Sequence, residues 1–384
     1  MSVDPVTEEP PMPADGGPLR LVQVGAGAMG RAWLAVVTAS ADIELVGLVD
    51  LDEGAAARAA AEVGRPDLAR ATSLADLLAR VDADAVVDVT VPEAHAEVST
   101  VALLAGLDVL CEKPAAPTVS QALSMAAAAE VTGRLLMISQ SRRYWRDLVA
   151  LRAQLGPLRP LGVVSCQFFR APHFGGFRDS MPHPLLVDMA IHQFDLARDL
   201  VGSEPAWISC TSWNPGWSWY AGDAAAQVEA GFADGTRFTF TGSWCSPGLE
   251  TSWNGDWRLS GAGGTALWDG DHPPVAQTSD GADVPAERGT GPEGIGGALA
   301  EFVTAVRGRT SGGPVPSGEV HSNVMSLAMV EGAVRSAQSG QRVRIADLLE
   351  EAHAEAVARE QRPALRAVLT SWPSVLAVVG TPHR

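Results

Sequence analysis

The sequence is short of features that would define its class at once, beginning with paired cysteines. Its four cysteines, Cys111, Cys166, Cys210 and Cys245, lie far apart and include no C-x-x-C pair. This spacing indicates neither a zinc site nor a disulfide framework. We therefore predict no bound metal and a reducing compartment.

Basic charge and long apolar runs are also scarce. The chain has 28 Lys and Arg against 45 Asp and Glu, which is a formal net charge of −17. Nucleic-acid binding needs clustered cations, so we expect no nucleic-acid partner and favour a neutral or weakly polar small molecule as ligand. No apolar run is long enough to cross a bilayer, so we expect no membrane partner.

The amino terminus resembles no secretion signal. Residues 1–18 are rich in Pro, Asp, Glu and Gly and lack both a basic start and an apolar core. We interpret them as a disordered leader of a cytoplasmic protein. The full 384 residues are long for one hydrophobic core, so the length favours two domains.

The first half alternates apolar runs with alanine-rich stretches, which is typical of βαβ units in a doubly wound parallel sheet. The expected strands are LRLVQVG from Leu19, IELVGLVD ending at Asp50, AVVDVTVP ending at Pro92, LDVLCEKP ending at Pro114, and LLMISQS from 135. We assign residues 19–141 to an NAD-binding Rossmann domain.

The second half has a different rhythm. Residues 205–268 alternate polar and apolar side chains, which predicts an open, mostly antiparallel sheet. Helices are expected in RDLVALRAQL, in LLVDMAIHQFDLARDLVG, and over 295–307 and 320–339, with a surface loop over 270–294. We assign 142–345 to a substrate-binding and catalytic α+β domain and 346–384 to a helical extension.

A glycine-rich turn follows the first predicted strand. Gly25, Gly27 and Gly30 form G-x-G-x-x-G between a strand and a helix. There the first glycine permits a tight turn, the second lets N–H groups approach a pyrophosphate, and the third lets helix and strand pack closely. This context predicts a dinucleotide site.

An acidic residue at the end of the second strand indicates which dinucleotide. Asp50 lies 20 residues after Gly30, where a carboxylate accepts hydrogen bonds from a ribose and repels a 2′-phosphate. NAD is therefore favoured over NADP. Two alternatives stay open: Asp52 or Glu53 holds the ribose, or the glycines only form a turn and Asp50 caps the next helix.

Two longer motifs resemble a known family. TVPEAHAEVSTVALLAGLDVLCEKP ends in Glu-Lys-Pro, and LLVDMAIHQFD places Asp188 and His192 four residues apart on one helix face. Such a stripe alone is usually a solvated face. Together the motifs resemble the glucose-fructose oxidoreductase and inositol dehydrogenase (Gfo/Idh/MocA) family from about residue 19 to about 345.

The resemblance implies a catalytic group of three residues. His192 would be the general base for a secondary alcohol, Asp188 would fix its tautomer, and Lys113 would stabilise developing alkoxide charge. Predicted cofactor contacts are Gly25, Gly27, Ala28, Met29, Gly30, Asp50, Thr90, Pro92, Glu112 and Lys113. Predicted substrate contacts are Arg143 (or Arg142), Tyr144, His183, Asp188, His192, Trp217 and Trp219. His95 is expected to be structural.

Tryptophans are concentrated in the second half. Eight of the 11 lie between residues 207 and 268, and SWNPGWSWYAGD holds three of them. Aromatic faces stack on sugars and cyclitols, but cores and subunit interfaces are equally rich in tryptophan. We assign most of them to core or interface, and Trp217 and Trp219 to the substrate.

These inferences predict an NAD-dependent dehydrogenase that oxidises a secondary ring hydroxyl of a sugar, sugar derivative or inositol, or reduces it in reverse. The resemblance implies a homodimer or homotetramer. Three alternatives stay open: an NAD-dependent glycosidase, an imine or enamine reductase, and a non-enzymatic dinucleotide sensor. The retained Lys113, Asp188 and His192 weigh against the sensor.

Overall fold

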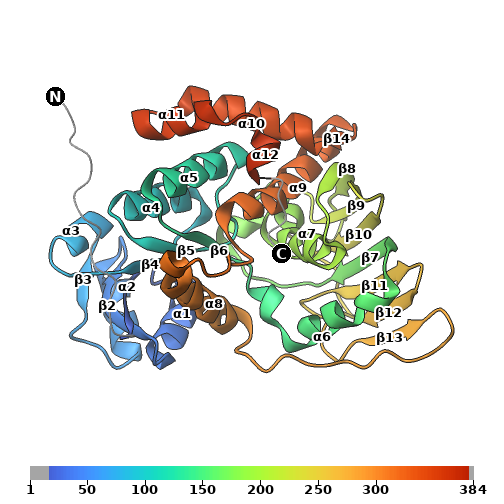
Figure 1. Ribbon diagram of the computed structural model, residues 1–384, viewed down its shortest axis with the longest axis horizontal. Coiled ribbons are helices and arrows are strands. Elements are labelled where there is room, and N and C mark those ends of the chain that lie inside the picture. Colours follow the sequence, from blue (N-terminus) through green and yellow to red (C-terminus); the bar gives the residue numbers. More distant parts are fainter. Residues whose placement is uncertain (1–16, 380–384) are drawn as a thin grey trace.

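The structure is a computed structural model that describes residues 17–379 (Figure 1). All but the last two residues of the expected leader therefore lie outside the described part. The described chain forms two sheets, one of six strands and one of eight. Within residues 17–379, no helix has both the length and the apolar character needed to cross a membrane.

The first sheet is parallel, in the order β3-β2-β1-β4-β5-β6. Its strands are β1 (Leu19–Val24), β2 (Ile43–Val49), β3 (Ala69–Ala71), β4 (Ala85–Asp88), β5 (Asp108–Glu112) and β6 (Leu136–Ser139). The five expected strands are confirmed. The edge strand β3 was missed, because its sequence ARA is too short to produce an apolar run.

Helices cover both faces of this sheet. One face carries α1 (Ala28–Ala39), α2 (Glu53–Glu62) and α8 (Gly294–Gly308), and the other carries α3 (Leu74–Leu78), α4 (Pro92–Leu104) and α5 (Val119–Thr132). Successive residues of β1 point to opposite faces, so Leu21 joins the cluster of Trp33 and Phe302, whereas Val22 joins the other cluster.

Helix α8 corrects the expected domain boundary. It belongs by sequence to the range 142–345, yet Phe302 and its neighbours pack on the first sheet beside α1. An apolar helix face indicates that the helix covers a sheet but does not specify which sheet. The first domain is therefore completed by a helix from far along the chain.

The second sheet has the order β13-β12-β11-β7-β10-β9-β8-β14 and is antiparallel except for the β7–β10 pair. Its strands are β7 (Leu161–Phe169), β8 (Pro205–Trp213), β9 (Ala225–Phe232), β10 (Arg237–Ser243), β11 (Asp256–Gly261), β12 (Gly264–Trp268), β13 (Val275–Thr278) and β14 (Val343–Arg344). The expected open, mostly antiparallel sheet is confirmed, although β7, β13 and β14 lie outside the expected strand region.

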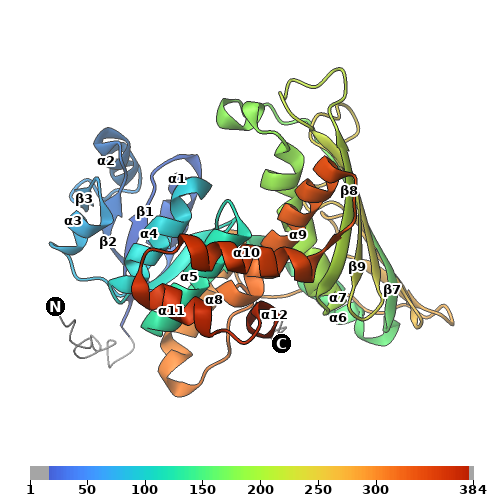
Figure 2. The same cartoon turned by 90° about the horizontal axis from the view of Figure 1, so that it is seen from above.

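Helices lie on one face of this sheet only (Figure 2). Its helical cover includes α7 (Ala190–Val201) and α9 (Val320–Ser339), and α6 (Arg146–Gln154) contacts β12. The last helices, α10 (Ile345–Arg359), α11 (Pro363–Ser371) and α12 (Val375–Val379), lie over α5 and α9. Helix α9 and the carboxyl-terminal helices thus connect the two halves of the molecule.

Candidate active site

The three motif glycines meet different surroundings. A Cβ on Gly25, whose φ is +105°, would lie 2.4 Å from the carbonyl oxygen of Val89, and a Cβ on Gly30 would lie 2.4 Å from the Gly25 oxygen. These two positions therefore require glycine for close packing. Gly27 faces open space and begins α1 with no side-chain cap. The helix start is left open for phosphate oxygens, so these residues fit a dinucleotide.

Asp50 and Asp52 have separate structural roles. The Asp50 carboxylate accepts hydrogen bonds from the N–H of Ala26 at 2.7 Å and of Asp52 at 2.9 Å. Asp52, not Asp50, caps α2 by accepting from Gly54 and Ala55. The interpretation of Asp50 as a helix cap is therefore wrong. Asp50 instead ends β2 beside the glycine turn, as a ribose-binding carboxylate would.

The carboxyl edge of the first sheet exposes unusually large apolar side chains. Met29 is 44% exposed, Leu51 90% and Val91 54%. They flank the glycine turn, Thr90, and Pro92 at the first turn of α4. Apolar surface beside a phosphate-binding helix start suits the rings of a dinucleotide. Leu51 and Val91 were missed, although each is an apolar residue just past a buried strand.

Glu112, a predicted cofactor contact, has both carboxyl oxygens bonded within the protein. One carboxyl oxygen accepts from the indole N–H of Trp33 at 2.9 Å, and the other accepts from the N–H of Lys113 at 3.0 Å. Burial raises the pKa of this carboxyl group. Glu112 therefore fastens α1 to β5 in the interior, and both of its oxygens are already used.

Lys113 is the only lysine in the sequence, and it reaches across to the second half of the molecule. Its ammonium group donates to the Asp188 backbone oxygen at 2.8 Å and to the Asp188 carboxylate at 3.2 Å. Arg178 pairs with the other carboxylate oxygen at 2.5 Å. Although burial raises it, the two cations hold the pKa of Asp188 below its ordinary value.

The expected contact between Asp188 and His192 is not formed. Asp188 lies in a π-helical turn, Leu185–Met189, and His192 lies in the first turn of α7. The change of helix type breaks the four-residue stripe expected from the sequence, and the carboxylate turns to Lys113 and Arg178. Asp188 therefore orients Lys113 and does not fix the His192 tautomer.

His192 is a buried, neutral imidazole. The residue is 8% exposed, and its Nδ1 has no hydrogen-bond partner among the described residues. Burial, then the charges of Arg142 and Lys113, lowers its pKa well below the ordinary value. Because the imidazole is unprotonated, it is free to accept a proton from another group.

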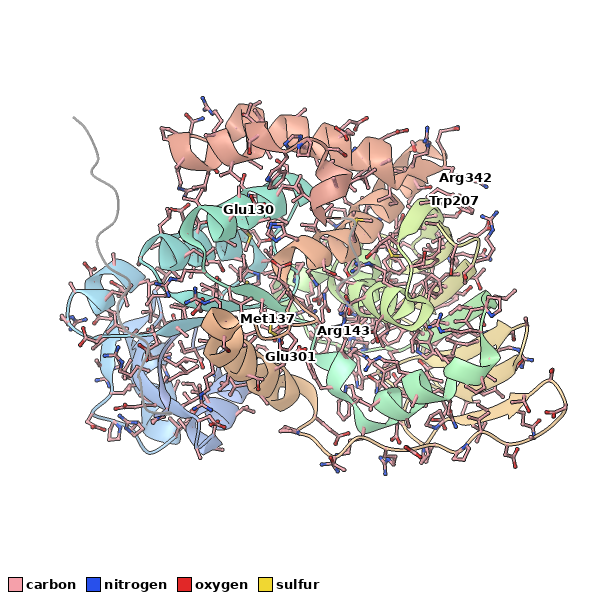
Figure 3. All side chains as sticks on the ribbon, in the orientation of Figure 1. Glu130, Met137, Arg143, Trp207, Glu301 and Arg342 are labelled. Atoms are coloured by element: carbon pink, nitrogen blue, oxygen red, sulfur yellow. The ribbon has the colours of Figure 1, made fainter. Side chains whose placement is uncertain are left out.

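Arg143 and Tyr144, which were predicted to contact the substrate, both have charged partners within the protein. The Arg143 guanidinium forms a buried bidentate pair with Asp195 at 2.7 and 2.8 Å, and the Tyr144 hydroxyl donates to Glu301. Both line a cavity of about 350 Å³ together with Arg152 and Glu301. Arg143 and Glu301 lie close to each other in Figure 3. The arginine whose charge acts on His192 is Arg142.

Three further residues were predicted to contact the substrate: His183, Trp217 and Trp219. His183 is buried, and its Nδ1 lies 3.4 Å from the Ser212 hydroxyl oxygen and 3.8 Å from a carboxylate oxygen of Asp223. Trp217 is 67% exposed, with its N–H on the Cys245 carbonyl. Trp219 stacks on His173 with ring centroids 3.6 Å apart, and its Nε1 is buried without a partner in the described chain.

His95 has the expected structural position. Its ring nitrogens lie 2.7 Å from the Pro114 carbonyl oxygen and 3.2 Å from that of Thr90. The imidazole thus ties the segment after β4 to the segment after β5.

Comparison with known proteins places the chain in a family. Residues 19–140 match the family model described as "Oxidoreductase family, NAD-binding Rossmann fold", and residues 154–269 match the "GFO/IDH/MocA C-terminal domain". The Agrobacterium radiobacter oxidoreductase solved with NAD+, L-tartaric acid and magnesium has the same fold, with a TM-score of 0.78 over 86% of this chain and 99% of that one, at 20% identity.

Two curated relatives align over most of this chain, and a third aligns over about half of it. "Uncharacterized protein y4oX" of Sinorhizobium fredii is 30% identical over 86% of this chain and 97% of its own. The 1,5-anhydro-D-fructose reductase of Ensifer adhaerens is 27% identical over 84% and 97%. Inositol 2-dehydrogenase 1 of Saccharopolyspora erythraea is 32% identical over 48% and 55%. The chain therefore belongs to the Gfo/Idh/MocA family and is an oxidoreductase with an NAD-binding Rossmann domain.

Proposed function

We propose that this oxidoreductase is a dehydrogenase that oxidises a secondary ring hydroxyl of a sugar, sugar derivative or inositol with NAD, or reduces the ketone in reverse. The observation that carries this proposal is the meeting of Lys113 with Asp188 beside the neutral imidazole of His192. A cation that stabilises an alkoxide and a base that removes its proton are the two groups that alcohol oxidation needs.

Each of these residues has a distinct part in the proposed reaction. The glycine turn, the start of α1 and Asp50 would hold NAD, which would supply the hydride acceptor for the carbinol carbon. His192 takes the hydroxyl proton, and Lys113 donates a hydrogen bond to the same oxygen while it becomes a carbonyl. Asp188 and Arg178 position Lys113, because the carboxylate between the two cations holds the ammonium group by a second hydrogen bond. Asp188 is thus a positioning residue.

Aromatic side chains near this group suit a sugar ring. Tyr220 is within electrostatic reach of Asp188, and its ring lies 5.2 Å from that of Trp219. The exposed Phe174 and Phe177 rings flank Arg178 at 5.4 and 4.7 Å. Such faces can stack on the C–H surface of a pyranose or cyclitol. We keep Trp219 as a substrate candidate and give Trp217, whose N–H is already bonded, a lower rank.

The test follows nicotinamide absorbance with purified protein, NAD or NADP, and inositols, aldoses, aminosugars and glycosides as substrates. Turnover with NAD that is lost in Lys113→Ala supports the dehydrogenase. Cleavage of a glycoside without net reduction of NAD, with NAD retained by the protein, would favour the glycosidase. Reduction of an imine alone would favour the imine reductase. Binding of NAD without any turnover would favour the sensor.

We further propose a homodimer or homotetramer formed through the uncovered face of the second sheet (Figure 2). Val163, Leu267 and Val275 are 56%, 42% and 63% exposed on its strands. Light scattering on the purified chain tests this, and Leu267→Glu is expected to reduce the mass to that of a monomer. The four buried, unpaired cysteines support the expected cytoplasmic location, which fractionation of cells would test.

A further inference from the structure

Arg142 is a partly buried cation without a carboxylate partner among residues 17–379. It follows β6, and its guanidinium contacts only neutral groups. These are the Trp253 carbonyl, the Asn254 side-chain oxygen at 3.0 Å and the Met189 sulfur at 3.9 Å. Its neighbour in sequence, Arg143, is fully paired with Asp195. Burial accordingly lowers the pKa of Arg142 to about 9.

This environment is unusual for an arginine. A guanidinium has five N–H groups in a planar fork that matches the two oxygens of a carboxylate or phosphate. The recorded contacts of Arg142 use Nη1 for both oxygens and Nη2 only for a sulfur. One side of the fork is therefore left without an oxygen acceptor in the described chain.

Arg142 also lies next to the proposed reacting groups. Met189, which it contacts, immediately follows Asp188 in the π-helical turn. Arg142 and Lys113 are the two charged groups that act on His192, and both are cations. The Asp188 carboxylate is itself shared by two cations, Lys113 and Arg178.

In the described chain, Arg142, Lys113 and Arg178 have one carboxylate ion-pair partner between them, Asp188, whereas the molecule as a whole is acidic. The chain carries a formal net charge of −17, from which the sequence analysis expected a neutral or weakly polar ligand. An excess of cations in a partly buried site is unfavourable unless an anion joins them. Net charge reports the average surface, whereas recognition depends on the charges that line the site.

We propose that the substrate carries an oxyanion, a carboxylate or a phosphate, and that Arg142 is the residue that selects for it. This inference rests on the proposed dehydrogenase function and names the substrate class, an acidic sugar or polyol. The oxyanion would complete the fork of Arg142 and balance the cations around Asp188.

A bound oxyanion also has a consequence for proton removal. Burial, together with the charges of Arg142 and Lys113, keeps His192 neutral in the free protein but also makes it a weak base. A negative charge placed on Arg142 offsets one of these cations and strengthens the base when substrate arrives. An acidic substrate would thus strengthen the base that removes the proton from its own hydroxyl group.

The experiment compares substrates that share a ring and differ only at one carbon. The probes are D-glucose, D-glucuronate and D-glucose 6-phosphate, with the corresponding galactose series. NADH formation gives kcat/KM, and calorimetry gives the dissociation constant of each probe. The variants are Arg142→Gln, Arg142→Lys and a control, Arg359→Gln, which removes a cation that is 78% exposed on α10.

The expected result is a preference of the unsubstituted protein for an anionic probe over its neutral counterpart. Arg142→Gln should lower kcat/KM for that probe by about 10- to 100-fold, the range for a charged hydrogen bond, with a much smaller loss for the neutral sugar. Arg142→Lys should recover part of the preference, and Arg359→Gln should keep it in full. The relative values for carboxylate and phosphate identify the oxyanion.

Failure of this inference and of the proposed function give different results. Oxidation of neutral sugars with no anion preference, or a preference unchanged in Arg142→Gln, overturns the inference and leaves the dehydrogenase standing. Absence of NADH formation with every probe counts against the proposed function. In that case calorimetry still tests the inference by itself. The anionic probe must bind with a lower dissociation constant than the neutral sugar, and Arg142→Gln must remove this difference. Unchanged NAD binding shows that each variant is folded.

Discussion

Replacement of Lys113 tests the proposed chemistry most directly. Lys113→Met keeps most of the side-chain volume but removes two hydrogen bonds, at 2.8 and 3.2 Å, to the backbone and carboxylate of Asp188. Asp188 keeps its pair with Arg178 at 2.5 Å, so the carboxylate is not left alone. We therefore expect the variant to fold, with a free energy of unfolding lower by about 1–3 kcal/mol.

The effect on turnover should be much larger than the effect on stability. A donor that stabilises charge developing on the reacting oxygen contributes about 2.7–4 kcal/mol to the transition state. Its loss corresponds to a decrease of about 100- to 1000-fold in kcat, measured by NADH formation. Urea unfolding measures the stability term separately. A variant that keeps more than a tenth of the turnover would refute the role of Lys113.

The composition offers a second route to the same answer. Lys113 is the only lysine in the sequence, so acetylation of side-chain amines modifies this residue alone, beside the terminal amino group. Acetylation removes the charge. Loss of turnover should follow the extent of Lys113 acetylation measured by mass spectrometry. Full turnover at complete acetylation would contradict the proposal without any substitution.

Three further predictions concern other parts of the molecule. Asp50→Asn keeps an oxygen for the Ala26 N–H but removes the charge, so the ratio of kcat/KM for NADP to that for NAD should rise by about tenfold or more; an unchanged ratio would exclude a ribose contact. Arg143→Met leaves the buried Asp195 without its bidentate partner, so urea unfolding should show a loss of about 3–5 kcal/mol; a loss below about 1 kcal/mol, the range of an exposed ion pair, would be contrary to this assignment. Removing the positive charge in Arg142→Gln should raise the pKa of His192 and move the acidic limb of kcat/KM for a neutral sugar to higher pH; no movement would show that the limb belongs to another group.

The lowered pKa of His192 also makes the free energy of unfolding depend on pH. Its ordinary value is 6.5, and the folded protein binds the proton less tightly than the unfolded chain does. Keeping His192 neutral therefore costs nothing above the ordinary pKa but destabilises the fold as the pH falls from there toward the folded-state pKa. The pH series of the kinetic experiment should include unfolding controls in this range.

Much of the first domain was predictable because its signals are local. Strand, glycine turn and helix follow one another directly, and the packing at Gly25 and Gly30 is set by residues a few positions apart or on the adjacent strand. Apolar runs of four to seven residues identified five of the six strands. The edge strand β3 escaped because pairing on one side is its main support, and pairing has no local signature.

The sequence by itself determined the fold class, the family and the residue types available for chemistry. The tertiary structure decided which of them meet. Asp188 turned to Lys113 and Arg178 because a π-helical turn interrupts the helix, and the four-residue spacing gave no warning of this. Arg142 and Arg143 are adjacent and chemically identical, yet one pairs with Asp195 and the other faces His192. Helix periodicity reports which side chains share a face, whereas their partners come from segments far away in the chain, which only the folded molecule brings together.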